Sequence, residues 1–139
     1  MTMSLSQTLK PGNPDFQDKI DNLVSWANQH LSGRGIFIND ITHDFSDGTN
    51  FLNLYEVLTK RSFPITWCKT PTSVAEKRKN IGAFLTVLQN GRIVKHGAIR
   101  ADDILWGATI PTFYALRALR IYLDREIQKA NRSNSSLDN

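Results

Sequence analysis

Residues 44–52 read DFSDGTNFL, a polar turn that runs directly into an apolar helical pattern. Ser46 or Asp47 is placed to cap a helix of about Gly48 to Lys60, because short polar side chains accept hydrogen bonds from the free N–H groups of a first turn. Apolar residues fall on most sides of this segment, and a helix of that kind is surrounded by others. The pattern therefore predicts a central helix, with apolar positions at Phe51, Leu52, Leu54, Tyr55, Val57 and Leu58.

The segment before this turn carries another helix pattern. It opens at Asn13-Pro14-Asp15, where a cap residue, a first-turn proline and an acid near the positive helix end coincide. Its far end is expected at Ser32-Gly33, because glycine can adopt the left-handed conformation that ends a helix. Trp26 and His30 flank one apolar stripe at helical spacing, which consists of Phe16, Ile20, Leu23, Val24, Ala27 and Leu31.

Two more long helices are predicted after the central one. The first begins at Ser73, which forms an S-x-x-E capping box with Glu76, and runs to Gln89. The second opens at Thr109-Ile110-Pro111, again a cap and an early proline. A short turn over Ala101 to Leu105 separates them. Since no convincing strand alternation occurs, we predict an all-α bundle of four main helices plus short turns.

The length of 139 residues fits one domain, which we place at residues 13–128. Residues 1–12 are expected to form a flexible leader, and residues 129–139 a polar tail or linker that suits a connection to a further domain. The leader lacks the pattern of a signal peptide, and a single cysteine, Cys68, excludes an internal disulfide. We therefore expect a cytoplasmic location.

Residues that perform catalysis or hold metals are sparse. The three histidines, His30, His43 and His96, are scattered, and Cys68 has no partner at ligand spacing, so we expect neither a metal site nor a cofactor. The turn at 44–48 superficially resembles a calcium loop, but His43 and Phe45 would stand where acids are needed. The sequence predicts a protein that is not an enzyme.

The charge is divided unevenly along the chain. Residues 1–59 hold three Lys or Arg against seven Asp or Glu, whereas residues 60–139 hold fourteen against six. A basic half suggests an acidic partner surface, although a merely solvated surface fits the charge equally well. Lys77-Arg78-Lys79 is not accompanied by a zinc finger, an RNP pattern or a basic zipper, so nucleic acid is not an expected partner. No apolar run is long enough to span a bilayer, and we expect no membrane insertion.

The order of these signals resembles the calponin homology family over roughly Phe16 to Leu123. The resemblance is carried by four segments, each on the expected element: LVSWANQHL (23–31) is similar to the W-x-N-x-x-L helix, DFSDGTNFL (44–52) to the D-x-x-D-G-x-x-L element, KNIGAFL (79–85) to the N-I-x-x-F-L helix, and Ile99 with ADDI (101–104) to the short turn before the last helix. The resemblance implies that its signature residues define the fold and not an active site, with Trp26 in the core; these residues are Trp26, Asp47, Gly48, Phe84 and Leu85.

The subtype within the family differs between the two halves of the chain. The first half resembles the leading domain of tandem actin-binding pairs, whose members continue with a G-N-x-K-x-x-L-G-x-I-W pattern. Here Ala108 replaces the Asn, Ile110 the Lys and Arg117 the Trp. Residues 112–119, TFYALRAL, are instead similar to the T-L-x-A-L helix of single-copy members, as in calponin-like proteins and at the N-termini of Rho guanine-nucleotide exchange factors.

The resemblance implies a protein-interaction module of the actin cytoskeleton that binds actin filaments, weakly as a lone domain. The alternative is a regulatory or scaffolding domain of a Rho exchange factor or similar signalling protein, docking on another domain. In either case we expect a monomer associated with the cytoskeleton. The candidate contacts to an acidic partner are the cations of the second half, Lys60, Arg61, Lys77, Arg78, Lys79, Arg117 and Arg120.

Overall fold

The computed structural model describes residues 13–137, and within this range the chain forms helices and no strand, which confirms the predicted all-α class. The expected leader, residues 1–12, lies outside the described residues. The long helices are α2 (Pro14–Leu31), α4 (Thr49–Thr59), α5 (Val74–Asn90) and α7 (Thr109–Leu137); the short ones are η1 (Ser32–Arg34), α3 (Ile41–Asp44) and α6 (Ala101–Leu105).

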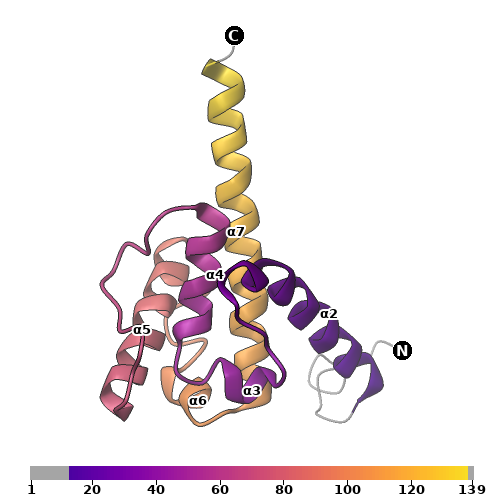
Figure 1. The fold of residues 1–139 in the computed structure, drawn as a ribbon, viewed down its shortest axis with the longest axis vertical. Helices are drawn as coiled ribbons and strands as arrows, with labels where there is room; N and C mark the ends of the chain where they lie inside the picture. Colours follow the sequence, from indigo (N-terminus) through magenta and orange to yellow (C-terminus); the bar gives the residue numbers. More distant parts are fainter. Residues whose placement is uncertain (1–12, 138–139) are drawn as a thin grey trace.

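Helix α4 is the centre of the bundle, as the sequence predicts. It packs against α2, α5 and α7, which lie around it in Figure 1. Phe51 of α4 is fully buried, with its ring 4.7 Å from that of Phe45 and stacked at 4.2 Å on that of Phe84. Burial of such aromatic side chains is the main source of stability in a core of this size.

The turn before α4 explains the Asp-Gly pair of the family signature. The N-cap of α4 is Gly48, not the predicted Ser46 or Asp47. From the position before it, the Asp47 carboxylate accepts hydrogen bonds from the Thr49 N–H at 2.9 Å and the Thr49 hydroxyl at 2.7 Å. Gly48 has φ 82, and a Cβ there would lie 2.9 Å from the Ile81 nitrogen and from Asn80 Cβ. Only glycine lets the start of α4 approach α5 this closely.

Two signature asparagines tie loops to helices. The Asn28 side chain on α2 accepts from the Ile38 N–H at 2.7 Å and donates to the Ile38 carbonyl at 3.1 Å. The Asn80 side chain on α5 accepts from the Cys68 N–H at 2.9 Å and donates to the carbonyls of Cys68 at 2.8 Å and Asp47 at 3.3 Å. Each amide therefore replaces the strand or helix bonds that the loops lack.

Of the four helix caps predicted from the sequence, those of α2 and α5 are confirmed, whereas Thr109 is the first helical residue of α7 and not its cap. Asn13 caps α2, and Ser73 with Glu76 forms the capping box of α5. Helix α2 ends at Leu31 with Ser32 as its C-cap, where its end was predicted. Gly33 is not the left-handed residue, however: the chain continues through η1, and Gly35 is left-handed, with φ 73. The short helix α3 was not predicted, because four residues are too few to show a helical period.

The resemblance implied that Trp26 lies in the core, but the structure places it outside. It is half-buried and packs against the edge of the core. Its ring contacts the His30 ring at 5.6 Å, and the Arg120 guanidinium lies 5.1 Å from its centroid. Trp26 flanks the buried stripe of α2, so its indole is only partly covered by the core. The exposed part of the ring is free to contact the Arg120 cation.

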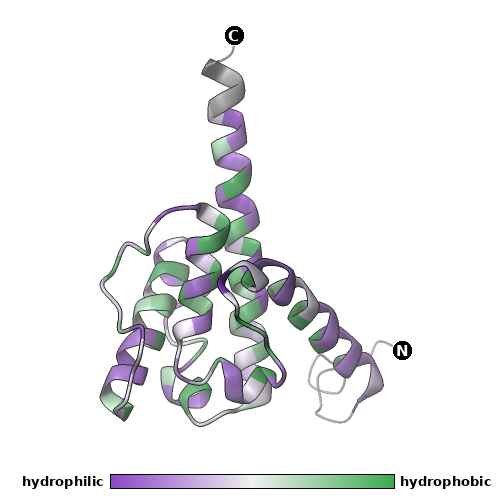
Figure 2. Ribbon diagram, viewed as in Figure 1, coloured by the Kyte–Doolittle hydropathy of each residue, from purple (hydrophilic) through white to green (hydrophobic). Residues whose placement is uncertain are grey.

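Helix α7 is longer than the sequence indicates. Residues 129–137, expected to be a polar tail, continue the helix, which projects beyond the other helices in Figure 1. Figure 2 shows that hydrophobic residues gather where α7 crosses the bundle and that hydrophilic ones predominate along the projecting part. Within this stretch Lys129, Ala130 and Arg132 have high helix propensity, and each residue added to a helix that has already formed gains a backbone hydrogen bond without needing an apolar face.

Candidate protein-interaction surface

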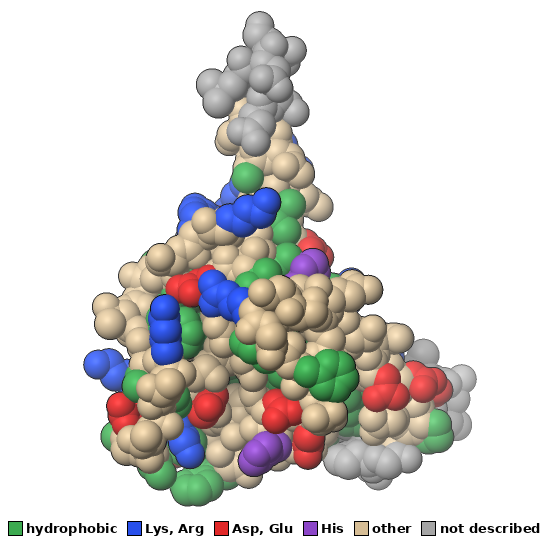
Figure 3. All heavy atoms as spheres, viewed as in Figure 1, with side chains coloured by type: hydrophobic (Ala, Val, Ile, Leu, Met, Phe, Trp, Pro, Cys, Tyr) green, Lys and Arg blue, Asp and Glu red, His purple; other side chains and the backbone are tan. Residues whose placement is uncertain are grey.

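The seven predicted cations lie in three places. Lys60 and Arg61 follow α4, Lys77, Arg78 and Lys79 lie in the first turns of α5, and Arg117 and Arg120 lie midway along α7. In Figure 1, α4 ends near the side from which α7 projects, whereas α5 begins at the opposite side. Figure 3 likewise shows Lys and Arg side chains separated by other atoms on the face in view. The structure therefore does not gather the candidates into one patch.

The group after α4 is partly engaged within the fold. Arg61 lies 3.6 Å from the carboxylate of Glu126 on α7, and Lys129 lies 3.3 Å from the same carboxylate. Lys60, with φ 57, ends α4 and is exposed. Both residues line a hollow of about 600 Å³ against the projecting part of α7, together with Ile127 and Ala130. Exposed ion pairs of this kind contribute about 0–1 kcal/mol, so this group is available to a partner.

The group on α5 sits beside the capping box. Arg78 forms a 2.8 Å ion pair with Asp102 of α6, Lys77 is half-buried and Lys79 is exposed. The Glu76 carboxylate accepts bonds from the Cys68 thiol, Thr72 and Ser73, and these lower its pKa to about 2. The hydrogen bond from the Cys68 thiol to Glu76 also raises the pKa of that thiol. This thiol is stabilised in its protonated form, which is the opposite of an activated nucleophile.

The group on α7 is the least engaged with acids. Arg117 and Arg120 are exposed, and neither forms an ion pair with any described residue. They line a hollow of about 310 Å³ between α2 and α7 that has Leu23 and Phe113 as apolar lining, with Lys19 and Asn22 on the α2 side. Three cations therefore line this hollow beside its apolar residues, and one of them, Lys19, was not predicted as part of the site.

Another carboxylate at the surface has a structural role. Glu56 on α4 pairs with Arg34 at 3.2 Å and accepts from the Phe63 N–H at 2.8 Å and the Trp67 indole at 3.4 Å. Burial opposes its ionisation, but these bonds outweigh it, so the Glu56 pKa lies below its ordinary value. The residue holds the loop after α4 against the bundle.

Other features of the described chain bear on what it can bind. Between residues 13 and 137, no three or more of His, Cys, Asp and Glu come together as a metal site would need. No helix of the described chain combines the length and hydropathy needed to cross a bilayer. Two large apolar side chains for which the sequence predicts no role, Phe37 and Trp106, are 68% and 72% exposed.

Comparison with known proteins settles what kind of domain this is. The profile of the Calponin homology (CH) domain matches residues 17–109, which is more than half of the chain. The chain belongs to the calponin homology family. Members of the family are generally interaction modules without enzymatic activity, found in proteins of the actin cytoskeleton and of signalling. The family signature falls on the α2, α4 and α5 residues whose bonds hold the fold together.

Two relatives carry the same kind of segment within much longer proteins. The CH domain is 34% identical over 89 residues to "Guanine exchange factor for Rac 30" of Dictyostelium discoideum, which covers 64% of this chain and 5% of that protein. It is 37% identical over 85 residues to "Filamin-A" of Drosophila melanogaster, which covers 61% of this chain and 4% of that protein. The chain thus spans a small part of the length of either relative.

Proposed function

We propose that this CH domain is a non-enzymatic actin-binding module that contacts filaments weakly through the cations of α7. The observation that carries the proposal is the pair Arg117 and Arg120, exposed, without acidic partners in the described chain, and joined by Lys19 across the α2–α7 hollow. Charge complementarity of this kind speeds encounter and orients a partner, while contributing modest affinity. Lys60 and Lys79 are further contacts in this proposal.

Weak binding is expected for two reasons. The tandem members contribute a second domain to the filament, whereas this chain carries one CH segment in its matched region. The turn into α7 also lacks the Asn, Lys and Trp of the tandem pattern and has Ala108, Ile110 and Arg117 there. Fewer contacts remain, and the ones proposed are charged and solvent-exposed.

The test is co-sedimentation of the purified domain with actin filaments over a series of salt concentrations. We expect binding at low salt that falls steeply as ionic strength rises, because the screening length shortens from about 10 Å at 0.1 M to about 3 Å at 1 M. Binding that is tight and insensitive to salt would contradict a contact through exposed cations. No binding at any salt would reject actin as the partner.

The second candidate is a regulatory or scaffolding domain of a Rho-family exchange factor. It is favoured by the similarity to the Dictyostelium exchange factor and by the TFYALRAL helix of residues 112–119, which resembles single-copy members. In that case the domain docks on another protein domain and not on filaments. Absence of actin binding, together with binding of the groove described next to an acidic peptide, would favour this candidate.

A further inference from the structure

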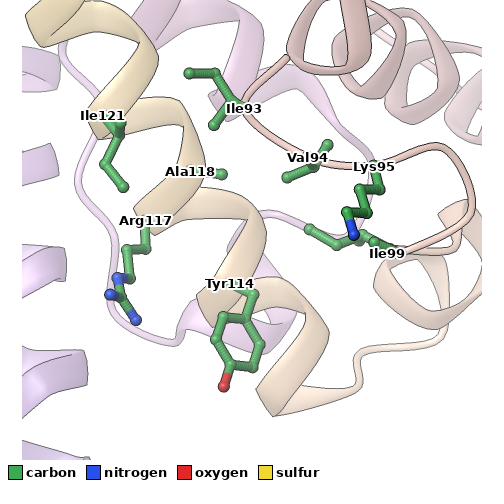
Figure 4. A pocket seen from close by; sticks show the side chains of 9 residues that line it. Ile93, Val94, Lys95, Ile99, Tyr114, Arg117, Ala118 and Ile121 are labelled. Carbon is green, nitrogen blue, oxygen red and sulfur yellow. The ribbon is translucent and has the colours of Figure 1, made fainter.

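A second hollow on α7 lies on the side turned toward the loop after α5. It has a volume of about 400 Å³ and is lined from α7 by Tyr114, Arg117, Ala118 and Ile121, and from the loop by Ile93, Val94, Lys95, Ala98 and Ile99. Figure 4 shows the Val94 side chain directed across the hollow toward Ala118. We call this site the α7 groove. Of the four segments that carry the family resemblance, only the one before α6 contributes to it, through Ile99.

The loop that forms one wall is held in place by the fold. The Ile93 N–H donates to the Leu88 carbonyl at 3.0 Å, and the Ala98 N–H donates to the Lys95 carbonyl at 3.0 Å. Gly91 lets the chain leave α5 close to α7, since a Cβ there would lie 3.0 Å from the Tyr122 ring. The groove is therefore present before a ligand arrives, and binding would cost little ordering of the loop.

The lining is apolar and only partly covered. Ile121 is 42% exposed, and Ile93, Val94 and Ile99 are half-buried. Small side chains at Ala98 and Ala118 leave the space open. Apolar side chains of this size gain about 25 cal/mol for each Å² removed from water, so a ligand that covers them is stabilised.

The charges around the groove have one sign. Lys95 and Arg117 are the charged residues of its lining, both are exposed, and neither pairs with an acid in the described chain. The acid next along α7 is Asp124, three residues past Ile121 and followed by Arg125. An apolar trough with two free cations is complementary to apolar side chains flanked by carboxylates.

The spacing of the lining suggests the shape of the ligand. Tyr114, Ala118 and Ile121 occupy successive turns of α7, so the groove runs along about 10 Å of helix at 1.5 Å per residue. A second helix laid along this line would present side chains at i, i+3 or i+4, and i+7 to the same turns. This is the periodicity of an amphipathic helix.

We propose that the α7 groove binds an acidic amphipathic helix of a partner protein, with its apolar side chains over Ala118 and Ile121 and its carboxylates at Lys95 and Arg117. The site goes beyond actin binding, because eight of its nine lining residues are not among the seven predicted filament contacts; Arg117 is common to both. The partner is defined by that chemistry, an apolar stripe within an acidic segment.

The test uses fluorescein-labelled peptides and fluorescence anisotropy with the whole 139-residue chain. The probe peptide has Leu at i, i+4 and i+7 and Glu at most other positions; a second has the same composition in scrambled order, and a third has Gln in place of Glu. We expect saturable binding of the first and at least about tenfold weaker binding of the other two, because each lacks one half of the complementarity.

Two variants examine the groove itself. Ala118→Leu fills the space without changing charge, and Lys95→Glu reverses one charge without changing the apolar lining. Each should weaken binding of the probe peptide about tenfold. Lys60→Glu, the same reversal at an exposed site outside the groove, should leave affinity within about twofold. Circular dichroism of each variant establishes that it is folded.

The outcomes separate this site from filament binding. Ala118→Leu and Lys95→Glu should co-sediment with actin as the unchanged protein does, so loss of the peptide alone assigns the groove to a different partner. No binding of the probe peptide, equal binding of the scrambled one, or full affinity in the folded Ala118→Leu variant would overturn the proposal. Loss of actin binding in both variants would also overturn it, since the groove would then be part of the filament contact.

Discussion

The seam between α4 and α5 and the outward side of α7 use their polar residues in opposite ways. At the seam, Asp47 and Asn80 direct their side chains to backbone groups of the fold, and Gly48 leaves room for that contact. On α7, Arg117 faces solvent without an acidic partner in the described chain, between two hollows that it lines on either side. The polar side chains at the seam find their hydrogen-bond partners within the fold, whereas the Arg117 charge has no acidic partner among the described residues.

This difference explains why the residues that identify the family do not identify its partner. Asp47, Gly48 and Asn80 stabilise the bundle whatever the protein binds. Residues on the α7 surface contribute little to stability and can vary with the partner. Changes at the seam should therefore lower stability, and changes on α7 should alter binding.

The largest expected effect is at the seam. Gly48→Ala should lower the free energy of unfolding by about 3 kcal/mol, because an alanine at φ 82 is strained and its Cβ would stand 2.9 Å from the Ile81 nitrogen. Gly33→Ala is the matched control, since a Cβ there meets nothing within 4 Å. Urea denaturation of both variants measures the difference. Equal stabilities would show that α4 can move away from α5 at little cost.

An intermediate effect is expected at the edge of the core. Trp26→Ala should cost about 2 kcal/mol, less than the roughly 3–5 kcal/mol of a fully buried aromatic such as Phe84, because its indole is only half-buried. Part of the loss is the contact with Arg120. The same denaturation experiment on Trp26→Ala and Phe84→Ala ranks the two. If Trp26→Ala lowered the free energy of unfolding as much as Phe84→Ala, the indole would belong to the core energetically.

The smallest effect concerns the capping box of α5. The Glu76 pKa is about 2 in the folded protein against 4.5 for a free glutamate, so ionised Glu76 stabilises the fold above pH 4.5 and that contribution disappears as pH falls toward 2. Glu76→Gln should melt below the unchanged protein at neutral pH, and the gap should close between about pH 4.5 and 2. Melting temperatures across this range decide it. A gap independent of pH would mean that the carboxylate charge is not what stabilises the cap.

Local chemistry made the starts of α2 and α5 predictable, whereas the left-handed residue after α2, the length of α7 and the surfaces needed the structure. Asn13 and Ser73 were predicted as caps because a cap acts on N–H groups two or three residues away. Gly33 was predicted as the left-handed residue after α2, but η1 follows the helix and the left-handed residue is Gly35. The length of α7 was underestimated because polar composition alone does not oppose a helix.

The candidate site was predictable in kind but not in position. A basic second half was evident from the sequence, yet Arg78 turned out to pair with Asp102 and Arg61 with Glu126. Lys19 and Lys95 lie beside Arg117 only after α2 and the loop after α5 have folded against α7. Helical spacing could have indicated that Arg117 and Arg120 are exposed, but not which residues from distant segments join them.

The most direct measurement is actin co-sedimentation and thermal melting of one variant, Arg117→Glu/Arg120→Glu, beside Arg92→Glu/Arg100→Glu, which makes the same charge change at exposed positions outside the α2–α7 hollow. We predict that the α7 variant melts only a few degrees lower, consistent with losing about 0.5–1 kcal/mol at the Trp26 contact, while its filament binding falls at least about tenfold. The control pair should retain most of its binding. Undiminished filament binding by the folded α7 variant would contradict the role assigned to these two arginines.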